Sequence, residues 1–437
     1  MRDLAFAATL VSLLALAAAR PFVGVLVWCW IGFMNPHREC WGFAVSMPWA
    51  MLTFLVTVFG CVVAREPKRL SLNAVTVLLA VFGVCITLTS IIGITPAEQR
   101  WQMWDRTIKV LAGLLLTSAM LTERRRVDAL VWIMVISLGF YGVKGGLFTL
   151  VTGGKYKVLG PHLTMVADRN HIAVGLLIAL PLMNYLRLQA RHRIVGMGLA
   201  FAMAMTVFAA IGTQSRSALI ALTATVGVFW LRSRGKIVSG MTMGVLVASA
   251  IAFMPDTWVE RMNTIQTYEQ DASAMGRITI WMAALALTQA HPLTGVGFNA
   301  TYSQGVVNTV TPHITARATH NIWLEVLADH GVPTFLVWLS IFLSGVWYSL
   351  RIVREARDRP ELGWAYDLAR MSQVSMVAYA VGGSFLSLSY WDFFWTILVA
   401  IGATHGLVAR AIREGARAAP LTWRARPAMQ AAAAERA

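Results

Sequence analysis

Charged residues are scarce in this chain of 437 residues: they make up 13% of it, whereas hydrophobic residues make up 57%. A soluble domain carries about a quarter charged residues. The composition therefore excludes a soluble enzyme or binding module of ordinary size, and the mean hydropathy of +0.62 agrees with this. We predict an all-α polytopic membrane protein, because a chain that spans lipid must satisfy its own backbone hydrogen bonds.

Acidic residues are fewer than basic ones, 21 against 37, which gives a formal net charge of +16. In a soluble protein this balance would suggest a nucleic acid partner. Here the lysines and arginines stand in short clusters between apolar runs, as in cytoplasmic loops that face anionic lipid headgroups. We therefore expect membrane lipids as partners and no nucleic acid. No nucleotide is expected either, since the chain has no Walker loop or dinucleotide fingerprint.

Cysteine is also rare, and the four cysteines show no metal-ligand spacing: Cys29, Cys40, Cys61 and Cys85. We predict neither a disulfide nor a metal site. His313, His320 and His330 do not have the spacing of a zinc site. No cofactor is expected.

Long apolar runs fill most of the chain. A membrane-spanning helix needs about 20 largely apolar residues, and the candidate spans are 41–64, 70–94, 108–121, 128–151, 172–187, 194–212, 217–231, 237–254, 332–350, 371–387 and 392–409. Residues 4–34 contain one broken span or two short ones, because Arg20-Pro21 interrupts the run. The total is about twelve. Pro21 stands where a signal peptidase would cleave, so we expect a retained membrane segment.

Basic clusters alternate with loops that lack them. The basic set is 65–69, 124–126, 187–193, 232–236 and 351–370, and the other set is 35–40, 95–107, 152–171, 213–216, 255–331 and 388–391. The positive-inside rule places the first set in the cytoplasm and the second outside. This predicts a transmembrane bundle (1–254), a large periplasmic loop and active-site region (255–331), C-terminal transmembrane helices (332–409) and a disordered cytoplasmic tail (410–437).

Several cationic residues fall on the predicted outer side: Lys144, Arg169, Arg216 and Arg277. Charges at membrane depth are costly and usually face a protein-lined or wet cavity. The ordinary alternative is snorkelling of the side chain to the interface. Arg216 and Arg277 are isolated from the basic clusters, and an arginine fork binds a phosphate or diphosphate through two hydrogen bonds. We therefore predict that both bind the phosphate or diphosphate headgroup of a lipid-linked substrate, with Lys144 and Arg169 as further substrate-binding candidates.

His320 is the candidate catalytic base. It precedes Asn321 and an apolar run, which is the pattern of a helix N-terminus. That position lowers the pKa of an imidazole and favours its neutral form, which accepts a proton from a hydroxyl. Asn321 is predicted to cap the helix, orient the histidine or contact a sugar. For Glu325 and Asp329 a salt bridge is the expected role.

The order of these motifs resembles the O-antigen ligase/polymerase superfamily of bacterial membrane glycosyltransferases. The motifs are Ser215-Arg216, Gly276-Arg277 with Trp281, the glycine turn Pro292 to Gly297, His320-Asn321-x-x-Leu324 and Gly331. Two glycines in the turn permit a close backbone approach to a ligand. The N-terminal half is similar to ligases associated with exosortase systems, through Pro21-Phe22, Asn35-Pro36-His37, Gly142-Val143-Lys144-Gly145-Gly146 and Gly160-Pro161.

The resemblance implies about twelve helices with both termini cytoplasmic, so that residues 4–34 form a single broken span. It implies metal-independent transfer of a preassembled glycan from undecaprenyl diphosphate at the periplasmic face. The motifs do not fix the acceptor, and we predict a sugar hydroxyl of lipid A–core at the bacterial inner membrane. Arg216 and Arg277 would hold the diphosphate and His320 would activate the acceptor hydroxyl. O-antigen polymerases and protein O-oligosaccharyltransferases share these motifs. A lipid-linked glycan transporter is the alternative from another class, but we find no internal repeat of the kind that transporters often show.

Overall fold

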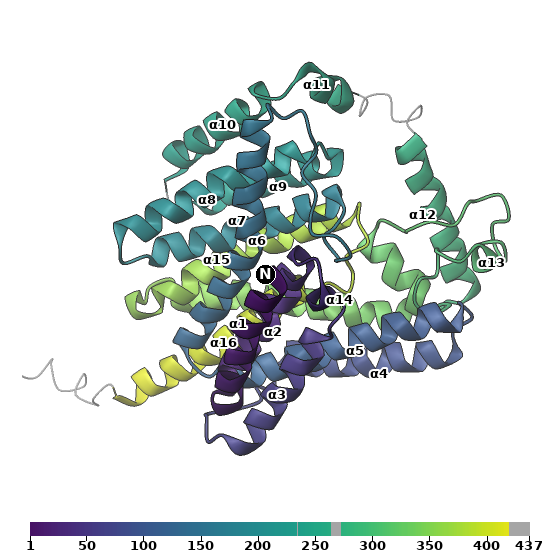
Figure 1. The fold of residues 1–437 in the computed structure, drawn as a ribbon. Helices are drawn as coiled ribbons and strands as arrows, with labels where there is room; N and C mark the ends of the chain where they lie inside the picture. Colours follow the sequence, from purple (N-terminus) through teal and green to yellow (C-terminus); the bar gives the residue numbers. More distant parts are fainter. Residues whose placement is uncertain (234, 264–271, 419–437) are drawn as a thin grey trace, which may run out of the picture.

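The computed structural model describes residues 1–233, 235–263 and 272–418, and within these ranges it contains helices and no strand (Figure 1). Seven of the described helices are long and apolar enough to cross a membrane: α1 (Arg2–Ala19), α4 (Ala74–Ile92), α6 (Arg124–Val151), α7 (Arg169–Gln189), α8 (Arg193–Gly212), α14 (Ile322–Ala356) and α16 (Asp392–Ala418). Three shorter apolar helices join them: α2 (Pro21–Met34), α3 (Trp49–Val63) and α10 (Lys236–Ala252). The described part of the chain is thus that of an all-α polytopic membrane protein. Helix length and apolar composition identify seven candidate spans there, fewer than the twelve predicted.

Three further helices belong to the bundle: α5 (Ala97–Met120), α9 (Arg216–Arg232) and α15 (Gly363–Gly383). Helix α15 packs against α7, α9 and α14, while α6 packs against α7 and α8. These helices bury the largest apolar core, which includes Tyr185 and Tyr379. Helix α16 continues to Ala418, so the predicted disordered tail is helical up to that residue, and 419–437 lie outside the described residues.

The basic loops gather at one end of the bundle, along the left side and the lower left of Figure 1. A chain of contacts joins them: Arg126 to Glu66 (2.7 Å), Arg124 to Gln189 (3.1 Å), Gln189 to Asp367 (3.0 Å), and Arg370 to the carbonyl oxygen of Arg232. The alternation of charge along the sequence therefore corresponds to two distinct ends in space. We call them the basic end and the opposite end.

Residues 4–34 form an antiparallel hairpin of α1 and α2, not a single broken span. Asp3 accepts a hydrogen bond from Gly42 at the opposite end (2.9 Å), whereas Phe22 donates to Glu66 at the basic end (3.0 Å). The chain reverses because Arg20 leaves the helical conformation and Pro21, whose φ is fixed, starts α2. The first residues of α1 thus lie at the end opposite the last described turn of α16, whereas the resemblance implies that both termini lie on one side.

The region 255–331, predicted as a large loop, is largely helical in its described part. It contains α11 (Asp256–Asn263), α12 (Ala272–Ala290) and α13 (Gln304–Val307), and it includes the first turns of α14. Helix α12 packs against α14, and α12 and α13 lie at the right of Figure 1, away from the basic end. This arrangement gives the region a rigid framework for side chains.

Helix α14 is kinked at Gly331, whose φ of 75° and ψ of 177° are not helical. Pro333 follows and has no N–H to donate, so the helix cannot close its hydrogen bonds across this point. A Cβ on residue 331 would lie 2.7 Å from the carbonyl carbon of Leu293, and the positive φ also favours glycine here. The kink therefore leaves backbone groups of α14 that need other partners.

The Pro292–Gly297 turn supplies these partners. Val296 and Gly297 donate to the carbonyl oxygens of Ala328 (3.1 Å) and Asp329 (2.8 Å), and Val332 donates to that of Pro292 (2.8 Å). We call these three bonds the clasp. They fix the end of α12 to the outer part of α14. Gly295 and Gly297 thus permit close approach to protein backbone and side chains, not to the ligand expected from the sequence.

We predict that positions 308 and 233 lie on opposite sides of the membrane, with 308 outside, because the basic end faces the cytoplasm under the positive-inside rule. A cysteine replacing Asn308, in a chain whose native cysteines are replaced, should react with a membrane-impermeant thiol reagent in cells whose outer membrane is permeabilised. A cysteine replacing Ser233 should react only after lysis of the inner membrane. The reverse labelling pattern would place the candidate site described below in the cytoplasm.

Candidate functional site

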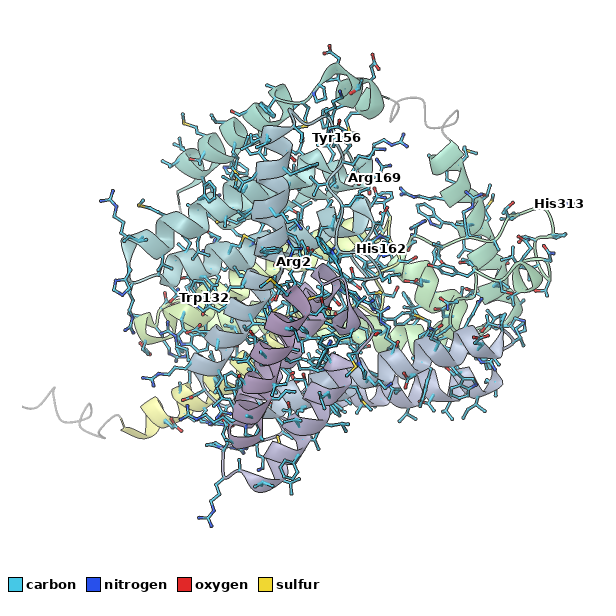
Figure 2. All side chains as sticks on the ribbon, in the orientation of Figure 1. Arg2, Trp132, Tyr156, His162, Arg169 and His313 are labelled. Atoms are coloured by element: carbon cyan, nitrogen blue, oxygen red, sulfur yellow. The ribbon has the colours of Figure 1, made fainter. Side chains whose placement is uncertain are left out.

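A cleft of about 200 Å³ lies at the opposite end, and it joins three parts of the chain. It is lined by Asp168 and Asn170 at the start of α7, Gly276 and Arg277 on α12, and Arg317 and His320 before α14. Figure 2 labels Arg169, at the start of α7, toward the side on which α12 lies. The structure therefore brings two of the predicted catalytic residues, Arg277 and His320, to one cleft.

His320 is held by backbone contacts on both sides. Its N–H donates to the Ser387 hydroxyl (3.0 Å), and the Trp281 indole of α12 donates to the carbonyl oxygen of Thr319 (2.8 Å). Asn321 caps α14 by accepting from the N–H groups of Trp323 (3.0 Å) and Leu324 (3.2 Å). The capping role predicted for Asn321 is confirmed, and it sets the start of the helix beside the histidine.

The surroundings of the His320 imidazole favour its neutral form. Its Nδ1 is buried and has no hydrogen-bond partner among the described residues. Burial, aided by the positive charges of Arg277, His171 and Arg317, lowers the pKa of His320 to about 4, while Asp168 acts in the other direction. The sequence predicted a lowered pKa from the helix N-terminus, but burial is the largest cause. At neutral pH the ring is uncharged and able to accept a proton.

Asp168 and Asn170 form the wall of the cleft at the start of α7, and Asp168 holds this wall together through hydrogen bonds. Its Oδ1 accepts from the backbone N–H of Asn170 (2.8 Å) and lies 3.3 Å from Nδ1 of His171. Burial alone would raise the pKa of Asp168, but the hydrogen bonds from His171 and Asn170 outweigh it and hold that pKa below its ordinary value. The His171 and His320 rings are 6.3 Å apart between centroids. Asp168 therefore places a fixed negative charge beside a cationic cleft.

Arg317 is a cleft residue that the sequence reasoning missed. A Cβ on Gly276 would lie 2.0 Å from Nη1 of Arg317, so the guanidinium occupies space that only glycine leaves at this point of α12. The Arg317 backbone is fixed by donation to the carbonyl oxygen of Thr301 (2.9 Å). The only signal in the sequence was an isolated arginine three residues before His320. Arg277 and Arg317 together make the cleft cationic.

Arg216 is not among the residues that line this cleft. It starts α9 after Ser215, whose hydroxyl caps the helix by accepting from Ala218 (3.2 Å). Arg169 donates to the carbonyl oxygen of Gln214 (3.2 Å). This bond joins the start of α7, which forms one wall of the cleft, to the segment that carries Arg216.

Lys144 lies in a different hollow. It forms an ion pair with Glu39 (3.2 Å), in which the Lys144 side chain is 57% exposed. That hollow is lined by α6 and by residues 157–161, and Lys144 does not line the cleft with His320. The structure thus separates this predicted substrate-binding residue from the others.

Glu325 and Asp329 form no salt bridge among the described residues, contrary to the expectation. Both are buried, and they accept hydrogen bonds from neighbouring loops. Glu325 accepts from the Ser389 backbone N–H (3.3 Å) and hydroxyl, and Asp329 from the Ala300 N–H (2.9 Å) and the Tyr390 hydroxyl (2.8 Å). These carboxylates anchor the loops behind the cleft, because buried polar groups need such partners.

Two family models match the chain. The model described as O-Antigen ligase matches residues 200–339, which contain Arg216, Arg277, Arg317 and His320. The model of a family of unknown function (DUF5935) matches residues 1–192, which contain Lys144 and the Asp168–Asn170 wall. None of the curated proteins compared with the chain matches it. The cleft is therefore built from both matched regions.

Proposed function

We propose that this protein, which its O-antigen ligase domain places in that family of membrane enzymes, transfers a preassembled glycan from undecaprenyl diphosphate to a sugar hydroxyl of lipid A–core. The reaction would take place at the periplasmic face of the bacterial inner membrane. The observation that carries the proposal is the cleft in which a half-buried, neutral His320 lies with Arg277 and Arg317. Such a cleft offers a base and an anion site side by side.

In the proposed reaction the arginines bind the donor diphosphate and His320 binds the acceptor hydroxyl. The hydroxyl oxygen attacks the anomeric carbon while His320 takes its proton, and the bond from that carbon to the diphosphate oxygen breaks. Arg277 and Arg317 neutralise the charge that develops on the leaving diphosphate, and Arg216 at the start of α9 assists them. A single displacement of this kind inverts the anomeric configuration.

The electrostatics link base strength to donor binding. Arg277 and Arg317 help to keep the pKa of His320 low in the empty cleft. A bound diphosphate offsets their charge, and an anion near an imidazole raises its pKa. His320 then moves toward its ordinary pKa of about 6.5, where a general base works best near neutral pH. The base is thus strongest when a donor is present.

The proposal is tested by transfer in vitro with purified full-length protein, lipid-linked glycan and lipid A–core, and with no nucleotide. Glycan attached to lipid A–core is the expected product. Elongation of the lipid-linked glycan alone would identify a polymerase, and transfer to an added protein acceptor would identify a protein O-oligosaccharyltransferase. Movement of the donor across the bilayer without a covalent product would identify a transporter and overturn the proposal.

We predict that transfer continues at an unchanged rate in excess chelator. Of the described residues that line the cleft, only Asp168 carries a carboxylate, and it already accepts hydrogen bonds from Asn170 and His171. The arginines supply the charge that Mg²⁺ would otherwise provide at a diphosphate. The measurement is the initial transfer rate with and without chelator. Loss of activity that a divalent ion restores would contradict this prediction.

A further inference from the structure

Several N-terminal motifs do not line the cleft with His320. They come together at the hollow that contains Lys144, whose volume is about 240 Å³. It is lined by Glu39, which follows Asn35-Pro36-His37, by residues of α6 around Lys144, and by the loop 157–161, which contains Gly160-Pro161. All of these residues belong to the region 1–192 that matches the family of unknown function. Segments more than 100 positions apart in the sequence thus build one surface feature.

The loop 157–161 packs closely against its neighbours because two glycines lack a side chain. A Cβ on Gly145 would lie 2.8 Å from Cγ1 of Val158, and a Cβ on Gly160 would lie 1.8 Å from the carbonyl oxygen of Val166. The loop is also tied by the hydrogen bond from the Gly160 N–H to the carbonyl oxygen of Ala167 (3.1 Å). The next residue, Asp168, lines the cleft with His320. The hollow and the cleft therefore share one continuous, well-anchored segment.

The hollow combines positive charge with aromatic surface. Lys144 and Lys157 line it, and Glu39 is the single carboxylate among its described lining residues. The Lys144 ammonium binds Glu39 but remains more than half exposed. Phe148 adds an exposed ring, and the buried Tyr141 donates to the carbonyl oxygen of Met34 (2.7 Å). Lysines attract a carboxylate or phosphate, and aromatic rings offer an apolar face to a sugar.

The volume limits the ligand to a small group. Pockets for drug-sized ligands enclose about 300–1,000 Å³, so a hollow of about 240 Å³ suits one sugar ring rather than an oligosaccharide. Arg277 and Arg317 of the O-antigen ligase domain already provide the anion site for the donor diphosphate in the proposed reaction. The hollow is built by residues of the other matched region, 1–192. Its loop 157–161 continues along the chain to Asp168 and Asn170, which line the cleft with His320. This placement suits the acceptor.

We propose that the hollow binds an acidic sugar of the acceptor, bearing a carboxylate or phosphate, and so selects which acceptor reaches His320. The proposal rests on the proposed transfer reaction. Lys144 and Lys157 bind the anionic group, and Phe148 contacts the ring. Glu39 competes with the ligand for Lys144 in the empty hollow. The N-terminal region is thereby assigned the role of acceptor selection.

The test compares two lipid-anchored acceptors that differ only in carrying glucuronic acid or glucose. Wild-type protein should use the glucuronate acceptor about fivefold better in kcat/KM, in keeping with a partly exposed charge pair. Lys144→Gln should bring the ratio close to one by raising KM for the acidic acceptor. Lys155→Gln is the matched control, because it removes the same charge from an exposed residue that does not line the hollow. It should keep the wild-type ratio.

The variant Glu39→Gln distinguishes two roles of Lys144, binding of the acceptor and a structural ion pair with Glu39. If Lys144 binds the acceptor, removing its competitor should raise the preference for glucuronate. If the Lys144–Glu39 pair only holds the fold, Glu39→Gln and Lys144→Gln should change the ratio in the same direction, and the proposal is overturned. Equal use of both acceptors by wild-type protein overturns it as well, as does loss of the preference when excess phosphatidylglycerol is added, which would mark a phospholipid site.

A binding measurement keeps the two proposals apart. Saturation-transfer NMR with the full-length protein in nanodiscs compares methyl glucuronide with methyl glucoside and does not depend on catalysis. Binding of the glucuronide that Lys144→Gln abolishes, in a protein that transfers no glycan, would reject the proposed function and retain the acidic-sugar site. Glycan transfer without any difference between the two sugars, in either measurement, would retain the function and reject the site.

Discussion

Replacing His320 should slow glycan transfer by about 10²–10⁴-fold, the usual contribution of a positioned general base, while the donor still binds. His320 has a φ of 49°, a left-handed conformation that asparagine adopts more readily than alanine. His320→Asn therefore preserves the backbone better, and His320→Ala serves as the second variant. The measurements are the rate of transfer and the binding of lipid-linked donor for each. Normal transfer, or a defect confined to donor binding, would contradict the role of base.

The pH profile gives this prediction a second measurement. The pKa of His320 is lowered to about 4 in the empty cleft, so loss of the free enzyme's activity should occur only as the pH falls toward that value. With donor bound, the diphosphate offsets the positive charge of Arg277 and Arg317 and raises the pKa of His320. The acidic limb of kcat should therefore lie at higher pH than that of kcat/KM for the donor. Coincident limbs would mean that the arginines do not bind the diphosphate.

Replacing the cleft arginines should weaken donor use strongly. A hydrogen bond to a charged group contributes about 1.5–3 kcal/mol, so Arg277→Ala and Arg317→Ala should each cost about 10- to 100-fold in donor affinity. Arg→Lys should rescue only part of this, because lysine keeps the charge and loses the fork. Arg216→Ala should cost less than either, because Arg216 does not line the cleft. Donor binding by each variant is the measurement.

Gly276→Ala provides a matched control for Arg317. The added Cβ would meet the far end of a flexible side chain, so the fold should tolerate it while the guanidinium is displaced. Its donor affinity should fall between those of wild type and Arg317→Ala. If Arg277 and Arg317 only snorkel to the membrane interface, all of these variants should lower expression and leave donor affinity intact.

The sequence predicted the fold class because apolar length and charge clustering depend on local composition alone. It also assigned Arg277 and His320 to the same outer region, although nothing in the spacing of these residues sets their distance. The hairpin of α1 and α2 could not be predicted in the same way. Arg20-Pro21 interrupts a helix, but whether the chain then continues or reverses depends on packing partners, here Glu66 at one end and Gly42 at the other.

The side chains that were misjudged share one cause. Arg317 carried no motif, and its place in the cleft depends on Gly276 of another helix. Glu325 and Asp329 suggested salt bridges, yet their partners are hydroxyl and backbone groups from loops distant in the sequence. Local patterns identify where a helix begins, as the Asn321 cap confirms. They do not identify tertiary partners.

The clasp has a consequence for how substrates reach the cleft. Arg277 stands on α12 and His320 precedes α14, and three backbone hydrogen bonds hold the end of α12 to the kink of α14. The clasp and the Trp281 hydrogen bond to the Thr319 carbonyl oxygen thus tie the helix that carries Arg277 to the segment that carries His320. We therefore expect the cleft to open at the Asp168–Asn170 wall, which belongs to the other matched region. In the proposed reaction, we expect donor and acceptor to enter by movement of that wall relative to the joined helices α12 and α14.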